Sequence, residues 1–139
     1  MKKYGASRST TAPPAAVWRV WSDPNRWSQW NSGIASAEVD GAIADGTTGK
    51  MTTDRGSSHD VTFHDVVAGR GFSMSMDGAP LTKFTFSCEI VPDGTGSTIS
   101  QAVAISGPLA FLFAPMLGNE MAKHFVPVLD DLAKAAETP

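Results

Sequence analysis

The residues with reactive side chains are few, and their spacing matches no nucleophilic site. Such a site needs a serine or cysteine beside a base that an acid orients. Cys88 is the only cysteine, which excludes an internal disulfide and a cysteine-based metal cluster. It lies in a segment where apolar and polar residues alternate, as in a half-buried strand. We therefore expect Cys88 to be a core residue.

The three histidines and the neighbouring acids form no recognisable set either. His59 and His64 lie five residues apart on a predicted strand and point to opposite faces, so they make no metal pair. Asp60 and Asp65 are separated in the same way and form no pair of catalytic carboxylates. His124 lies at the border of an apolar helix face, where we expect packing. The sequence predicts no catalytic residue and no metal ligand, and without a glycine-rich phosphate loop it predicts no cofactor.

The residue pattern favours binding of an apolar molecule over catalysis. Gln101 is the one polar residue expected on an inward strand face, where it either bonds a buried polar neighbour or orients a carbonyl or hydroxyl of a ligand. The inward faces are otherwise rich in Phe and Met. Met is flexible and suits a wall that repacks around different guests, although it also fills gaps in cores. The side chains predicted to contact a ligand are Trp27, Trp30, Phe63, Met74, Met76, Phe84, Phe86, Gln101, Val103, Met116, Met121 and Phe125.

Four tryptophans lie within residues 18–30. Trp18 and Trp21 share one face of a predicted helix with Val17 and are expected in the core. Replacing Trp18 with Ala should lower stability by about 3–5 kcal/mol if it is fully buried. Trp27 and Trp30 follow on a second short helix and are expected either in the core or on a pocket wall.

The remaining pattern predicts a sheet closed by helices. Strands are expected at 2–10, 34–39, 48–53, 59–67, 71–76, 81–91 and 97–106, because turn residues separate short alternating runs. The alternation is typical of an antiparallel sheet with one wet face. Two short helices should follow the first strand. One begins at Pro14. The other begins at Pro24, with Asp23 as its N-cap.

The C-terminal region predicts an amphipathic helix over residues 119–136. The apolar residues of 109–117 are out of phase with it, so we expect a restart with Asn119 as N-cap, or a kink. Segment 108–118 is therefore predicted to be a mobile cover that a lipophilic ligand quiets. The alternative is a rigid turn packed on the sheet or on a dimer partner. Residues 109–117 are too few to span a bilayer.

Length and composition bound the protein class. The 139 residues are expected to form a single domain, with 42% hydrophobic and 18% charged residues as in folded soluble proteins. A net charge of −3 and scattered basic residues argue against a nucleic-acid partner. The single cysteine favours a reduced, cytoplasmic setting, and the start of the chain does not read as a signal peptide.

Three stretches carry a resemblance to a known superfamily. They are the proline-led helix at 12–18 with the Asp-Pro turn and Trp-x-x-Trp segment at 22–31, the turn at 94–98, and the closing helix at 107–136. In these the chain resembles the SRPBCC, or START-like, superfamily and its polyketide cyclase/dehydrase-type proteins. The resemblance implies an α+β helix-grip fold: a curved seven-stranded antiparallel sheet around a long C-terminal helix, with an apolar cavity between them. Pro127 departs from the pattern and should bend the helix.

The resemblance implies binding of lipids, sterols, polyketides, hormones or quinones. We therefore expect a binding module for a hydrophobic small molecule. The alternative is a polyketide cyclase/dehydratase-type enzyme, which the scarcity of inward polar residues disfavours. A weaker third reading is an interaction protein like the family's co-chaperone activators, for which only 109–117 could supply an exposed apolar patch. We expect no membrane span. The sequence does not decide between a monomer and a homodimer.

Overall fold

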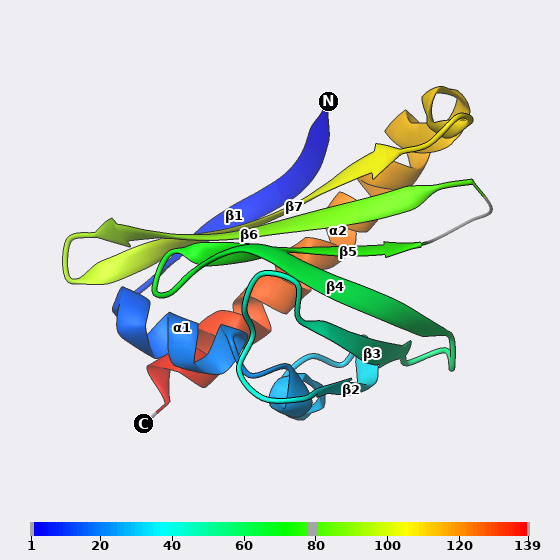
Figure 1. Ribbon diagram of the computed structural model, residues 1–139. Helices are drawn as coiled ribbons and strands as arrows, with labels where there is room; N and C mark the ends of the chain where they lie inside the picture. Colours follow the sequence, from blue (N-terminus) through cyan, green and yellow to red (C-terminus); the bar gives the residue numbers. More distant parts are fainter. Residues whose placement is uncertain (1, 78–80, 139) are drawn as a thin grey trace.

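The computed structural model describes residues 2–77 and 81–138, and these form a sheet with helices (Figure 1). In chain order the elements are β1 (Lys3–Thr10), α1 (Pro14–Trp21), the 3-10 helix η1 (Pro24–Gln29), β2 (Ile34–Val39), β3 (Thr48–Thr53), β4 (Ser58–Val67), β5 (Gly71–Asp77), β6 (Lys83–Asp93), β7 (Gly96–Ser106) and α2 (Ala110–Glu137). All the predicted strands are present, with ends that differ by no more than two residues.

The sheet has seven antiparallel strands in the order β1-β7-β6-β5-β4-β3-β2. Strands β2 to β7 follow one another as neighbours, while β1 pairs with β7 in a register that runs from Lys3 opposite Ala104 to Thr10 opposite Ser97. Gly94 occupies a positive φ of 61° in the turn between β6 and β7, a conformation that glycine adopts without steric strain. The predicted seven-stranded helix-grip fold is confirmed.

Alternation along the strands separates a buried face from a polar one. In β6, Phe86, Cys88 and Ile90 are buried, whereas Lys83 and Glu89 are exposed. The expected core position of Cys88 is confirmed. The buried face is the one that the helices cover.

The two short helices bring an aromatic cluster onto this face. The ring of Phe72 lies 5.8 Å from that of Trp21 and 6.2 Å from that of Trp27, and Trp27 also donates its indole N–H to the Trp21 carbonyl at 3.0 Å. Phe63 completes the cluster at 5.7 Å from Phe72. The ring of Trp18 lies 6.3 Å from that of Phe72 and the side chain is only half-buried, so the full burial assumed for its substitution is not met.

Asp23 precedes η1 at the expected N-cap position, but its side chain makes no capping hydrogen bond. Its carboxylate lies 3.5 Å from the guanidinium of Arg26. The expectation of a side-chain cap is therefore wrong, and the local interaction is a surface ion pair instead.

Helix α2 runs without interruption from Ala110 to Glu137, so the predicted start at Asn119 is wrong. Gly118 lies inside the helix because it packs against Tyr4 of β1, where an added Cβ would lie 2.3 Å from the ring. Pro115 and Pro127 also lie inside the helix, and both are exposed. The carbonyl groups that each proline leaves without an N–H partner can thus bond water, which makes the prolines tolerable.

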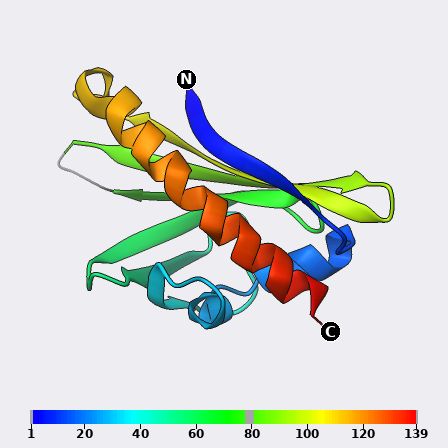
Figure 2. The ribbon, with the colours of Figure 1, turned by 180° about the vertical axis from the view of Figure 1, so that it is seen from behind.

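Two separate elements cover the buried face of the sheet. Helix α2 packs along β1 and β7 and against α1, as Figure 2 shows, while η1 packs on β2 at the other edge. Arg8 of β1 holds α2 through a 2.7 Å ion pair with Asp130, and Thr10 donates a 2.6 Å hydrogen bond to Glu137. None of the helices in the described ranges has the length and apolar character that crossing a membrane requires.

Candidate functional site

A small cavity of about 90 Å³ lies where the two covers meet over the sheet. Nearly every element contributes to its wall, and most of the contributing side chains are apolar. The lining residues are Trp21, Trp27, Asn31, Ile34, Met51, Phe72, Met74, Phe86, Cys88, Gln101 and Val128. Sheet residues form the floor, α1 and η1 one side, and Val128 of α2 the other.

Three polar groups interrupt this apolar wall. Asn31 is buried and uses its Oδ1 to accept the backbone N–H of Gly33 at 2.9 Å. Burial raises the pKa of the Cys88 thiol, because the thiolate would lose its hydration, so the group stays neutral at physiological pH. Gln101 carries a buried Oε1 for which the described residues provide no hydrogen-bond partner.

The structure brings four of the predicted contact residues to the cavity wall: Trp27, Met74, Phe86 and Gln101. Phe63, Val103 and Phe125 are buried, with the ring of Phe125 6.1 Å from that of Phe86, whereas Met76, Phe84, Met121 and Trp30 are half-buried. Met116 is 73% exposed. Contact of any of these residues with a ligand stays a prediction.

Seven wall residues were not among the predicted contacts: Trp21, Asn31, Ile34, Met51, Phe72, Cys88 and Val128. Some carried a usable signal. Phe72 and Cys88 alternate in phase with predicted residues of their strands, and Val128 lies on the apolar face of the closing helix. Asn31 carried none, because it follows a 3-10 turn whose direction is set by tertiary packing.

Segment 108–118 does not cover this cavity. No residue of the segment lines the wall, and Leu109, Phe111 and Leu112 are 43%, 76% and 66% exposed. The helix turns small residues, Ala110 and Gly118, toward the protein instead. Of the out-of-phase apolar residues, Leu109, Leu112 and Met116 are thus exposed, while Phe113 is half-buried against the core and does not line the cavity.

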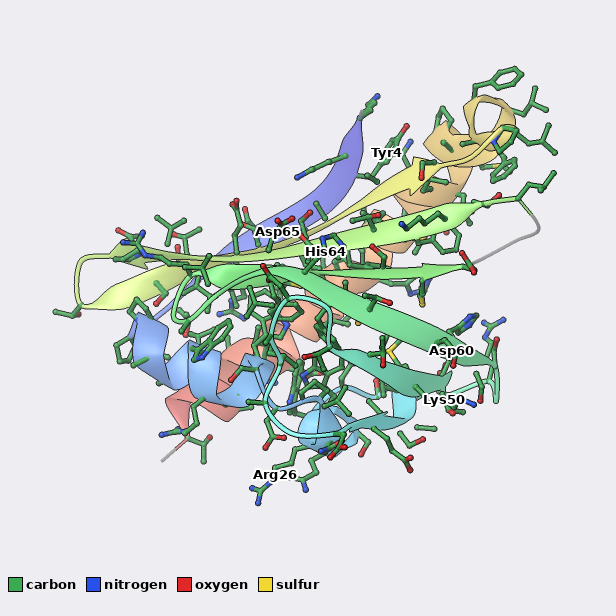
Figure 3. The ribbon with its side chains drawn as sticks, in the orientation of Figure 1. Tyr4, Arg26, Lys50, Asp60, His64 and Asp65 are labelled. Carbon is green, nitrogen blue, oxygen red and sulfur yellow. The ribbon has the colours of Figure 1, made fainter. Side chains whose placement is uncertain are left out.

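A second polar group of residues lies on the opposite face of the sheet (Figure 3). His64 Nε2 lies 2.7 Å from Ser75 Oγ, and its Nδ1 lies 3.3 Å from Asp65 Oδ2. The order of the three groups is that of a hydrolytic triad, and sequence spacing alone did not bring Ser75 into view. Ser75 is only 7% exposed, however, and β5 is an inner strand whose amides pair with β4 and β6. Without an accessible hydroxyl or free N–H donors for an oxyanion, the group does not form a nucleophilic site.

A larger open groove of about 680 Å³ lies between α1, η1 and the end of α2. Arg19, Arg26 and Lys134 line it together with Asp23 and Asp131, so both signs of charge are mixed along a solvated surface. The smaller cavity is less open than this groove, and its wall is mainly apolar, which is the usual character of a small-molecule site. Within residues 2–77 and 81–138, no group of three His, Cys, Asp or Glu side chains is arranged to hold a metal ion.

Comparison with solved structures shows what the fold is similar to. The truncated norcoclaurine synthase from Thalictrum flavum is 16% identical with a TM-score of 0.72, and the match covers 99% of this chain and 94% of that one. Ara h 8.0201 is 15% identical with a TM-score of 0.69, covering 96% and 98%. The protein CV1439 from Chromobacterium violaceum is 19% identical with a TM-score of 0.70, covering 99% and 98%. At these identities the likeness establishes the fold alone.

A search of curated protein sequences gave no match. A family model, described as polyketide cyclase / dehydrase and lipid transport, matches residues 1–137. The match spans both the cavity-forming elements and the closing helix, and it confirms the resemblance drawn from the tryptophan-rich segment. The chain therefore belongs to the polyketide cyclase / dehydrase and lipid transport family.

Proposed function

We propose that the protein binds a small, mainly apolar molecule in the cavity between the sheet, η1 and α2. The observation that carries the proposal is a partly open cavity whose wall of aromatic, Met and aliphatic side chains is interrupted by three neutral polar groups. Membership of a family whose description includes lipid transport supports it.

The size of the cavity limits the ligand that fits without rearrangement. Sites for drug-sized ligands measure about 300–1,000 Å³, well above the 90 Å³ found here. A single small ring suits the cavity as it stands. A lipid or polyketide chain would require α2 and η1 to separate.

Methionine methyl groups offer a direct test. Met51 and Met74 line the cavity, whereas Met116 lies exposed at the far end of α2 and serves as an internal control. Titration of ¹³C-methyl-Met protein with methylenecyclopentane should shift the Met51 and Met74 resonances and leave Met116 unchanged.

A pair of variants tests the location. Val128→Phe should fill the cavity and abolish these shifts, while Val126→Phe, at a position 52% exposed on the same helix, should preserve them. Shifts that survive Val128→Phe would place the ligand elsewhere. Mass spectrometry of the protein purified from cells would then identify any natural lipophile.

The enzymatic alternative has less support. The described cavity wall contains no carboxylate, histidine or lysine, and the Cys88 thiol is held neutral by burial. General acid–base catalysis needs a group whose pKa lies near the working pH. We therefore place binding before cyclase or dehydratase chemistry.

A further inference from the structure

We infer that Gln101 makes the cavity selective for ligands that carry one oxygen acceptor, a carbonyl or hydroxyl oxygen, on an apolar body. This inference rests on the proposed function and assigns the chemistry of its ligand. It starts from the position of Gln101 in the sheet. Gln101 lies in β7 between Ala6 of β1 and Cys88 of β6. Its neighbours on the same strand face, Ile99 and Val103, are completely buried and apolar. Along its own strand face, therefore, the amide has no polar neighbour among these residues.

The two ends of the Gln101 amide lie in different surroundings. Oε1 is enclosed and has no partner, while Nε2 is neither enclosed in this way nor bonded to another described residue. Since Gln101 lines the cavity and Oε1 is the enclosed atom, we infer that Nε2 is the end that faces the cavity. Nε2 carries two N–H donors and no acceptor. A ligand oxygen placed against it would receive a hydrogen bond in an otherwise apolar enclosure, where such a bond is poorly replaced by water.

The enclosed oxygen distinguishes this role from a structural one. A glutamine retained to stabilise a core would satisfy its polar atoms with buried partners, because an unpaired buried acceptor is unfavourable. Gln101 instead leaves its oxygen without a partner among the described protein groups. A polar side chain that the protein itself does not pair and that borders a cavity is the pattern expected of a ligand contact.

The experiment compares matched ligands in wild type and Gln101→Met. Cyclopentanone and methylenecyclopentane have nearly the same shape and differ by C=O against C=CH₂. Their dissociation constants are measured from the Met51 and Met74 methyl shifts. The ratio of the two constants in wild type, divided by the same ratio in Gln101→Met, cancels the ligands' different hydration. We expect this quotient to favour the ketone about tenfold in wild type. Val126→Phe, at an exposed position of α2 outside the cavity wall, should leave the ratio unchanged.

Two further readouts separate the outcomes. Pyrrole, which has an N–H donor but no oxygen acceptor, should lose no more affinity in Gln101→Met than methylenecyclopentane does. The midpoint of urea unfolding of ligand-free Gln101→Met should equal or exceed that of wild type, because the variant removes the unpaired oxygen. Loss of stability would show that Gln101 has a structural role and would overturn the inference.

The inference would be overturned if Gln101→Met left the ratio of the ketone and alkene dissociation constants unchanged. It would also be overturned if the variant lost more affinity for pyrrole than for the other two probes. Either result would leave the proposed function standing. Absence of any shift at Met51 and Met74 with both cyclic probes would overturn the proposed function and this inference with it.

Discussion

Cys88 shows how one buried side chain makes stability depend on pH. Burial raises the pKa of its thiol, so the folded chain keeps the proton above pH 9, where the thiol of the unfolded chain loses it. The unfolded state then binds fewer protons, and the free energy of unfolding falls by up to about 1.4 kcal/mol per pH unit. Urea titrations between pH 8 and 10.5 should show this decline. Cys88→Ala, which cannot titrate, controls for the tyrosine and the lysines. Parallel curves for the two proteins would contradict the assignment.

Trp21 and Trp18 should differ in their contribution to stability, although they share a helix face. Trp21 is 3% exposed and packs on Phe72, so Trp21→Ala should lower the free energy of unfolding by about 3–5 kcal/mol. Trp18 is half-buried, and Trp18→Ala should lower it by clearly less. Urea denaturation of the two variants decides the order. Equal losses would mean that Trp18 is packed as tightly as Trp21.

The sequence could place these side chains on faces but not at depths. Alternation correctly put Cys88 and Gln101 on the inward side of the sheet, because the two-residue period of a strand fixes the direction of each side chain. The depth of Trp18 depends on where α1 lies over Phe72, and local spacing does not contain that information. The place of Asn31 on the cavity wall was likewise not predictable, because tertiary packing sets the direction of the chain after η1.

At the scale of elements, Gly118 should tolerate no added methyl group. In an exposed helix interior, Gly→Ala stabilises by about 1 kcal/mol. Here the new Cβ would lie 2.3 Å from the Tyr4 ring, so Gly118→Ala should instead destabilise the protein, by about 1–3 kcal/mol. Thermal unfolding measures the effect. In a Tyr4→Ala background the same substitution should become neutral or stabilising. A stabilising Gly118→Ala in wild type would show that α2 does not press on β1 there.

The first two turns of α2 should exchange their amide protons quickly whether or not the cavity is occupied. Phe111, Leu112 and Met116 are exposed, and this part of the helix contributes nothing to the cavity wall. Local opening there gives up little buried surface. Hydrogen exchange with and without methylenecyclopentane tests this. Slower exchange at 111–116 on binding would restore the role of a ligand-responsive cover.

The start of α2 was unpredictable for a physical reason. Gly118, Asn119 and two prolines are helix-breaking signals when read locally. The contact of Gly118 with Tyr4, which lies more than a hundred residues away in the chain, outweighs them. The strands were easier, since glycine-containing turns and alternating runs coincide at each hairpin.

For the molecule as a whole, the exposed side chains at the start of α2 should contribute little to stability. Phe111 is 76% exposed, so Phe111→Ser should change the free energy of unfolding by less than about 0.5 kcal/mol. Chemical denaturation measures it, with Phe125→Ser as the contrasting buried position on the same helix. A large loss at Phe111 would show that this end is covered in solution.

The pairing of β1 with β7 also bears on how the protein is made. Lys3–Thr10 leaves the ribosome before the other strands, yet its strand partner, Gly96–Ser106, is the last of the described strands to be synthesised, and the helix that packs on both follows later still. At roughly 5–20 residues per second, translation leaves this amphipathic strand without its neighbour for several seconds. The hairpins from β2 to β6 can form in the meantime, but the edge of β6 stays open until β7 arrives. The nascent chain is therefore most open to wrong pairing or to chaperone binding in that interval, and completing the sheet depends on the final third of the chain.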